Sequence, residues 1–219
     1  MFETFGKRPS GARLARIRQS PNYRDGAFQN LSKTTVITPD SSYLKLMWTM
    51  WESRNIVQPA KRLPSVKTDL RNLPDGPPVV VWFGHSGYLL KINGKIILVD
   101  PVLSGHAAPF SFAVKAFPGA DEYKVDDMPD PDVLVLTHDH YDHLDYETFI
   151  SLKSRVKQVI CPLGVGTHLE YWGVDKSLIT EVDWWDSVEL AGFQFTATPA
   201  RHFSGRGLIR AKALWTSYV

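Results

Sequence analysis

The residues with the clearest chemistry lie together in the stretch Thr137–His143, which holds three of the seven histidines in the chain. Imidazole nitrogens bind borderline cations such as Zn²⁺ at about 2.0–2.1 Å, and a carboxylate can join them. In a loop, His138 and His140 can turn the same way while Asp142 and His143 lie over a neighbouring position. The spacing therefore predicts a metal centre, and ligands this close together suit two ions about 3.5–4 Å apart.

The element that must position this stretch is the short apolar run Val133–Leu136, which is typical of a buried strand and comes directly before it. Upstream, three further strands are predicted over Val79–Phe83, Tyr88–Ile92 and Lys95–Val99. Asn93-Gly94 between the last two is a strong hairpin signal. The long segment from Pro101 to Pro131 follows, and its length makes it a candidate functional loop.

Downstream of the histidine stretch, helical and strand patterns alternate before hairpins resume. The predicted elements are helices over Tyr146–Leu152 and His168–Trp172 and strands over Val159–Cys161, Val182–Trp185, Ser187–Leu190 and Phe193–Ala197. Ala191-Gly192 is a predicted tight turn. The alternation predicts a mixed α/β class with a layered sheet.

Residues 1–78 are predicted to form a basic N-terminal arm, and residues 79–219 the body. Residues 1–40 are polar and turn-rich, which indicates irregular structure. Ser41 and Ser42 are candidate caps of a short helix from Tyr43 to Trp51, and a proline-rich stretch ends at Pro78. The arm carries 13 Lys and Arg against 5 Asp and Glu up to Asn72, whereas the remainder carries 12 against 18. The arm therefore contacts either an external anionic surface or the acidic body itself.

Composition excludes several classes of protein. The chain of 219 residues is 43% hydrophobic and 22% charged, which does not fit a disordered chain or a coiled coil. Cys161 is the single cysteine, so an internal disulfide is excluded. No apolar run approaches about 18 residues, and the arginine-rich start lacks the apolar stretch of a secretory signal. A cytoplasmic location is the expectation, and nucleic-acid binding is not favoured because no nucleic-acid module is recognisable.

The stretch His138-x-His140-x-Asp142-His143 after a hydrophobic strand resembles the signature of metallo-β-lactamase-fold hydrolases. Other segments resemble the branch that contains N-acyl-phosphatidylethanolamine phospholipase D and the L-ascorbate-6-phosphate lactonases. These segments are Trp82–Gly87, Leu98–Pro101, Pro199–Arg206, Ser20–Gly26 and Pro162–Gly166. The resemblance implies a four-layer αββα sandwich and covers nearly the whole chain.

The resemblance implies a role for each matching residue. His138, His140 and His202 would hold a first zinc ion, and Asp142 and His143 would belong to a second. His202 also stands out by itself, because it follows a predicted strand. For His85, two roles stay open: supporting the metals or substrate, and a purely structural role. Asp100 would orient a metal-bound histidine.

Three other histidine or aspartate positions carry weaker expectations. Asp139 is expected to be a helper or an exposed residue, and His106 and His168 are assigned no chemistry. The family's bridging Asp and its last His have no match before Val219, and Ala211–Val219 is predicted to be a strand. We therefore expect a C-terminally truncated form of the sandwich, with a plain edge strand as the alternative.

The implied activity is that of a zinc-dependent hydrolase in which a metal-bound hydroxide attacks a phosphodiester, with Asp142 as a catalytic residue that orients it. The alternatives are a lactonase or ester hydrolase for a small sugar phosphate and an inactive metal-binding fragment. Iron and manganese stay open as metals. The substrate would be a small molecule or a phospholipid, and the basic arm with Trp48 and Trp51 would make peripheral membrane contact. The oligomeric state stays open.

Overall fold

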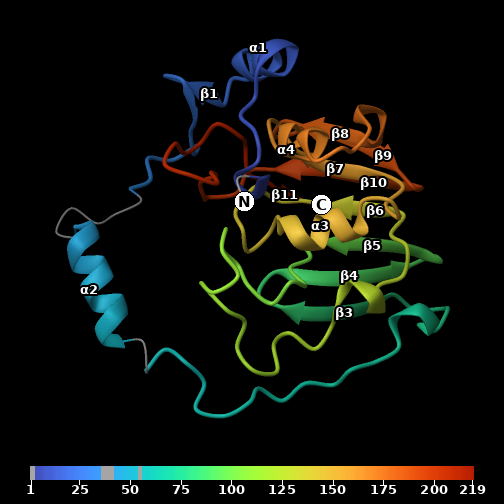
Figure 1. Cartoon of the computed structure of the whole chain (residues 1–219). Helices are drawn as coiled ribbons and strands as arrows, with labels where there is room; N and C mark the ends of the chain where they lie inside the picture. The colour runs from blue at the N-terminus through green and yellow to red at the C-terminus, as the bar shows by residue number, and fades with distance from the viewer. Residues whose placement is uncertain (1–2, 36–41, 54–55) are drawn as a thin grey trace.

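The computed structural model describes residues 3–35, 42–53 and 56–219, and its centre is a six-stranded mixed sheet (Figure 1). In spatial order its strands are β3 (Val79–Gly84), β4 (Gly87–Ile92), β5 (Lys95–Val99), β6 (Val133–Val135), β7 (Val159–Pro162) and β8 (Ile179–Val182). The first three strands pair antiparallel, and β5 to β8 run parallel. Strands β6 and β7 are buried at every position, as parallel strands covered on both faces require.

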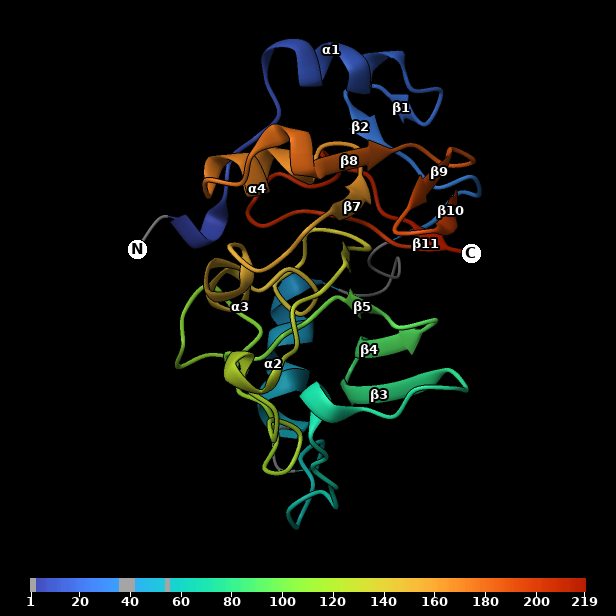
Figure 2. The ribbon, with the colours of Figure 1, turned by 90° about the vertical axis from the view of Figure 1, so that its right-hand side faces the viewer.

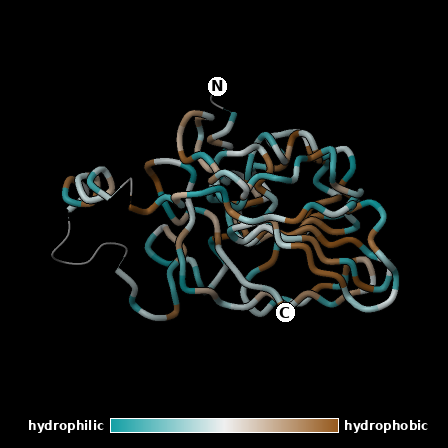
Figure 3. The backbone as a smooth tube through the Cα atoms, turned by 90° about the horizontal axis from the view of Figure 1, so that it is seen from below, coloured by the Kyte–Doolittle hydropathy of each residue, from teal (hydrophilic) through white to brown (hydrophobic). Residues whose placement is uncertain are grey.

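A second, three-stranded sheet covers one face of the first. It consists of β9 (Ser187–Leu190), β10 (Phe193–Thr198) and β11 (Ser217–Tyr218). Val135 and Ile160 of the first sheet share a buried cluster with Leu190 and Phe195 of the second. Figure 3 shows the hydrophobic segments concentrated in these stacked strands.

Two short helices cover the opposite face of the six-stranded sheet, α3 (Tyr146–Leu152) and α4 (Gly166–Tyr171). Phe149 and Leu169 of these helices join Leu134 and Cys161 in the largest buried cluster. Figure 2 shows α3 and α4 on one side of the strands and β9 to β11 on the other. The α/β class is therefore confirmed, and the described residues supply a helix layer and two sheet layers of the predicted sandwich.

The N-terminal residues contain regular structure that the sequence analysis missed. After a short 3₁₀ turn, η1 (Glu3–Phe5), they form helix α1 (Gly11–Gln19) and a hairpin of β1 (Tyr23–Arg24) and β2 (Ala27–Phe28). Ile17 and Phe28 are buried with Leu163, Trp184 and Trp215. The prediction of irregular structure is thus wrong for this segment. Helix α1 has a single fully buried apolar residue, so its sequence shows little hydrophobic periodicity. Residues 36–40 lie outside the described residues.

Helix α2 (Tyr43–Ser53) confirms the predicted short helix and stands apart from both sheets in Figure 1. The Ser42 hydroxyl accepts a hydrogen bond from the Lys45 N–H at 3.2 Å, so Ser42 acts as a cap. Ser41, the other candidate, lies outside the described residues. Within residues 3–35, 42–53 and 56–219, no helix is long and apolar enough to span a bilayer.

Two predicted strands are wrong in extent. The strand predicted over Val182–Trp185 shares only Val182 with β8, and only Ser217–Tyr218 of the predicted strand Ala211–Val219 pairs in a sheet. Their tryptophans explain the error, because the Trp184 indole N–H donates to the Trp215 carbonyl at 2.7 Å and the rings meet edge-on. The apolar residues in these segments thus pack as a tryptophan pair between turns.

Candidate metal centre

Strand direction brings the predicted residues to one edge of the six-stranded sheet. Because β4 is antiparallel to both β3 and β5, the strands β3, β5 and β6 all end at the same edge. His85 follows β3, Asp100 follows β5, and the stretch Thr137–His143 begins just beyond β6. The loop after β10 carries His202 to the same place, where its ring faces His138. Three strand ends and one loop therefore build a single site.

The first group of ligand atoms, here called the first trio, consists of His138, His140 and His202. The His138 Nε2 lies 3.0 Å from the His140 Nδ1 and 3.1 Å from the His202 Nε2, and the last two nitrogens are 3.3 Å apart. A ring N–H can serve one of these pairs only, so three converging ring nitrogens suit a shared cation. Tetrahedral Zn²⁺ with bonds of about 2.0–2.1 Å would set its ligands about 3.3 Å apart, which this arrangement fits.

The second trio consists of His85, Asp142 and His143. The His85 Nε2 lies 3.1 Å from the Asp142 Oδ2 and 3.3 Å from the His143 Nε2. The backbone of His85 has a φ of 46°, a left-handed conformation that turns its ring toward the other two. The second trio adjoins the first, since the ring centroids of His138 and His143 are 3.9 Å apart. His85 thus lies beside Asp142 and His143, in a position where it could support a metal ion.

Asp100 holds the ring of His143 from behind. Its buried carboxylate accepts hydrogen bonds from the Thr137 N–H at 2.8 Å and from the Thr137 hydroxyl, and its Oδ2 lies 2.8 Å from the His143 Nδ1. This contact assigns the Nδ1 proton of His143 to the carboxylate side. The Nε2 lone pair then faces His85 and Asp142, as a metal ligand requires. Asp100 therefore lies where its carboxylate can orient the His143 ring.

The first trio is electrostatically suited to a cation. Burial lowers the pKa of His138, and the neighbouring imidazoles of His143 and His140 lower it further. Burial is also the main cause of the lowered pKa of His140 and of His202. The three rings therefore stay neutral near pH 7 and offer lone pairs rather than protons.

Asp139, between two residues of the first trio, points away from them into a buried network. Its Oδ1 accepts the Gly205 N–H at 2.6 Å, and its Oδ2 lies 3.3 Å from the His168 Nε2. Burial raises its pKa, but the hydrogen bond and charge of His168 outweigh this and the pKa is lowered. Asp139 is therefore a buried helper rather than an exposed residue, and it joins the histidine stretch to the loop that carries His202.

Arg206 is a second part of this network, and no signal in the sequence singled it out. Its buried guanidinium donates to the backbone carbonyls of Asp139 at 2.9 Å and Leu144 at 2.6 Å. It also lies over the Tyr141 ring, 4.1 Å from the centroid. The guanidinium therefore fixes both ends of the histidine stretch. Its partners are backbone carbonyls brought close only by the fold, which a sequence pattern does not reveal.

Known proteins match this chain over part or most of its length. An uncharacterised protein of Mycobacterium tuberculosis is 38% identical over 215 residues, which cover 95% of this chain and 58% of the relative. The N-acyl-phosphatidylethanolamine-hydrolyzing phospholipase D 1 of Caenorhabditis elegans is 33% identical over 149 residues, covering 63% of this chain and 42% of the relative. The crystal structure of CmlA, a diiron β-hydroxylase from Streptomyces venezuelae, matches with 27% identity and a TM-score of 0.47, covering 64% of this chain and 27% of that one.

The chain thus spans less than two thirds of the length of these relatives. The family is shown by a match to a family model. Residues 95–219, which include the histidine stretch and His202, match the model of the beta-lactamase superfamily domain. The chain therefore belongs to the beta-lactamase superfamily, with the metallo-β-lactamase fold.

Proposed function

We propose that the two trios hold two metal ions, zinc in the first instance, and that the protein hydrolyses a phosphodiester. The observation that carries this proposal is the adjacency of two sets of three ligand atoms at one edge of the sheet. Two ions bound there would lower the pKa of a bound water and polarise the bond under attack. The neutral imidazoles of the first trio and the carboxylate of the second supply the mixed ligand set that zinc accepts.

The residues of the chain have separable roles in this proposal. Asp142 has a half-exposed carboxylate, with 42% of its side chain accessible, and reaches solvent as well as His85. It can therefore orient a water molecule and accept its proton in addition to its contact with the second trio. Asp100 is a positioning residue, because it acts through His143.

A phospholipid is the proposed substrate. The nematode relative is named for hydrolysis of N-acyl-phosphatidylethanolamine. In this chain Trp82 lies beside the second trio, where its indole N–H donates to the His85 carbonyl at 3.0 Å, and its side chain is exposed. An exposed indole next to the ligand atoms suits an acyl chain. Trp48 and Trp51 of α2 are also exposed, and we propose a cytoplasmic location with peripheral membrane contact through them.

Iron is a second candidate metal for the second trio. Two histidines and one carboxylate form the ligand set that non-haem iron proteins use. The first trio contains imidazole alone, which zinc also accepts. Metal analysis by mass spectrometry after purification therefore belongs to the test of function.

The test measures metal content and hydrolysis together. The substrates are vesicles with N-acyl-phosphatidylethanolamine, the soluble diester bis(p-nitrophenyl) phosphate, and a sugar-phosphate lactone. We expect about two metal ions per chain, hydrolysis of the vesicle lipid in preference to the other two, and loss of activity with EDTA. Preference for the lactone would contradict the phosphodiester proposal and favour a lactonase or ester hydrolase. A single weakly bound ion and no turnover would favour the other alternative, an inactive metal-binding fragment.

A pair of histidine variants provides the control. His138→Ala removes a nitrogen shared by two contacts of the first trio, so we expect loss of bound metal and of activity. His106→Gln changes a buried histidine that contacts Ser104 and belongs to neither trio, so metal content should stay unchanged. Equal metal content in the two variants would contradict the ligand assignment.

A further inference from the structure

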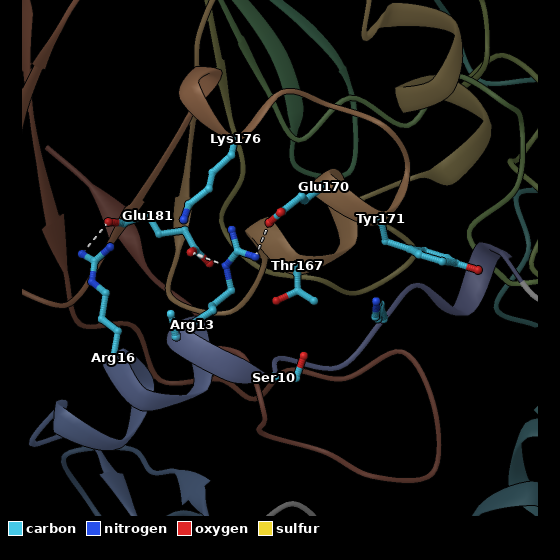
Figure 4. Close-up of a pocket in the computed structure, with 10 residues that line it drawn as sticks. Ser10, Arg13, Arg16, Thr167, Glu170, Tyr171, Lys176 and Glu181 are labelled. Atoms are coloured by element: carbon cyan, nitrogen blue, oxygen red, sulfur yellow. Dashed lines mark hydrogen bonds and ion pairs between the residues drawn. The ribbon is translucent and has the colours of Figure 1, made fainter.

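A polar cavity of about 550 Å³ lies between helix α1 and helix α4, and none of its lining residues belongs to either trio. Figure 4 shows charged side chains from both helices pointing into it. The titratable residues that line it are Lys7, Arg13, Arg16, Lys176, Glu170, Glu181 and Tyr171. Four cations thus face two carboxylates, and the cavity has a positive excess.

The ion pairs inside the cavity involve only some of its positively charged side chains. Arg13 is neutralised, because its Nη1 contacts Glu170 and its Nε contacts Glu181, each at 2.6 Å. Within the described part of the chain, Arg16 donates to the backbone carbonyl of Glu181 at 2.9 Å and contacts no carboxylate. Among the described residues Lys176 and Lys7 have no carboxylate partner within 4.0 Å. Among the described residues, three positive groups of the cavity therefore have no carboxylate oxygen within 4.0 Å, and the four cations and two carboxylates together give a net charge of +2.

A buried hydroxyl points to a missing hydrogen-bond partner at the same place. Thr167 lines the cavity and is 6% exposed, and in the described part of the chain its Oγ1 has no hydrogen-bond partner. Buried polar atoms in folded proteins are almost always satisfied by protein, water or ligand. The next residue, His168, lies between Asp139 and the Lys7 N–H, which donates to its Nδ1 at 3.0 Å. The Thr167 side chain thus lines the cavity with a hydroxyl that lacks a partner among the described residues.

We propose that this cavity is a binding site for a small phosphate-bearing anion, held by Lys7, Arg16 and Lys176 and hydrogen-bonded by the Thr167 hydroxyl. A phosphate group offers several strong acceptor oxygens and up to two negative charges, which suits several separate donors better than one carboxylate does. The Ser10 hydroxyl lines the same space. A ligand here would contact both the N-terminal segment and the body, so it would also stabilise their docking. The proposal does not depend on metal chemistry.

The test is calorimetric titration of the metal-loaded protein with inorganic phosphate. In the double variant Lys7→Gln/Lys176→Gln we expect phosphate binding to weaken by tenfold or more. Lys61→Gln removes one positive charge from an exposed position outside the cavity, and this variant should bind phosphate as the unmodified protein does. If phosphate bound to the metal ions instead, its affinity would be unchanged in the double variant. Binding that stays unchanged in the double variant, or no binding at all, would overturn the proposal.

Thr167→Val provides an independent arm. Valine has nearly the shape of threonine but no hydroxyl, so we expect about tenfold weaker phosphate binding with no fall in the thermal midpoint. Unchanged binding in this variant would show that the hydroxyl does not serve the ligand. If Thr167→Val fails to fold, the exposed lysines still decide the question.

The source of the phosphate is tested by competition. Glycerol 3-phosphate in solution and vesicles that contain phosphatidic acid are each added to the protein with bound phosphate. Displacement by glycerol 3-phosphate alone identifies a soluble ligand, and displacement by the vesicles identifies a lipid headgroup. Displacement by neither would contradict a site for phosphomonoesters.

Discussion

At the scale of single residues, Asp100 tests whether the second trio depends on orientation. Its φ of 41° is left-handed, a conformation that asparagine tolerates well, so Asp100→Asn changes the charge with little backbone strain. The His143 ring would lose a charged partner, and we expect metal affinity at the second trio to fall by about 10–100-fold. Competition with a fluorescent zinc chelator measures this affinity.

A matched variant separates this effect from a general one. Asp132→Asn makes the same change in another buried aspartate, whose Oδ2 accepts the Ile96 N–H at 2.9 Å away from both trios. Its zinc affinity should equal that of the unmodified protein. Equal affinities in Asp100→Asn and Asp132→Asn would remove Asp100 from its positioning role.

The first trio predicts a dependence of stability on pH. The pKa values of His138, His140 and His202 are lowered in the folded chain, chiefly by burial, whereas in the unfolded chain they lie near about 6.5. Below this pH the unfolded chain binds more protons, so proton uptake favours unfolding. The thermal midpoint of the EDTA-treated protein should be constant above about pH 7 and fall steadily below about pH 6.5.

The same measurement on a variant identifies the groups involved. His138→Ala removes the most strongly shifted of these imidazoles, so its midpoint should fall less steeply with pH. A midpoint in the unmodified protein that stays level down to about pH 5 would contradict the assignment, because protons would then not distinguish the two states.

The residues of the site differ in how far the sequence could predict them. Spacing singles out the histidine stretch because its residues are adjacent along the chain, and the family resemblance adds His202. His85 stayed ambiguous, since its place depends on a left-handed turn between β3 and β4. Asp139 and Arg206 contact backbone groups that are distant in sequence. Such contacts have no signature in a single sequence.

At the scale of elements, β-branched runs and turn signals predict the strands that carry the site. Lys95–Val99, Ser187–Leu190 and the helix Tyr146–Leu152 are predicted to the residue. The errors at Val182–Trp185 and Ala211–Val219 arise where tryptophans alternate with polar residues but pack on each other in a loop. An alternating pattern indicates which side chains are buried, but it does not show whether the backbone pairs with a neighbouring strand.

Helix α3 offers a test of how an element fixes the histidine stretch. Asp145 follows that stretch and caps α3, since its Oδ1 accepts the Glu147 N–H at 3.2 Å. Its Oδ2 also accepts the Ser104 N–H at 3.1 Å. Asp145→Ala should lower the free energy of unfolding by about 2 kcal/mol, because both the cap and a loop contact are lost.

Urea denaturation provides the measurement, with Asp175→Ala as the control. Asp175 caps the exposed 3₁₀ turn η4 (Lys176–Leu178), where its Oδ1 accepts the Ser177 N–H and the Ser177 hydroxyl, each at 2.8 Å. Its loss should therefore cost clearly less than the loss of Asp145. Equal costs for the two variants would mean that Asp145 acts as an ordinary cap without securing the loop.

At the scale of the whole molecule, the uneven charge of the sequence has a partner within the chain. Arg13 of α1 contacts Glu170 of α4 and Glu181 of β8, and Arg16 donates to the Glu181 carbonyl. The Asn30 side chain donates to the His202 carbonyl at 2.8 Å. The basic N-terminal segment thus docks on the acidic body and reaches the loop of the first trio. Farther along the arm, Arg62 contacts Glu122 and Lys67 contacts Asp127, so these cations also pair with acidic residues of the body.

Ile17 tests whether that docking belongs to the core of the protein. It is fully buried among Leu163, Trp184 and Leu214, so Ile17→Ala should lower the free energy of unfolding by about 2–5 kcal/mol, as truncation in a packed core does. Leu44→Ala in the exposed helix α2 makes a comparable truncation where 80% of the side chain is accessible, and should change stability little. Urea unfolding followed by tryptophan fluorescence reports both, because Trp184 and Trp215 adjoin Ile17. An Ile17→Ala midpoint equal to that of Leu44→Ala would show that α1 is held by its ion pairs alone.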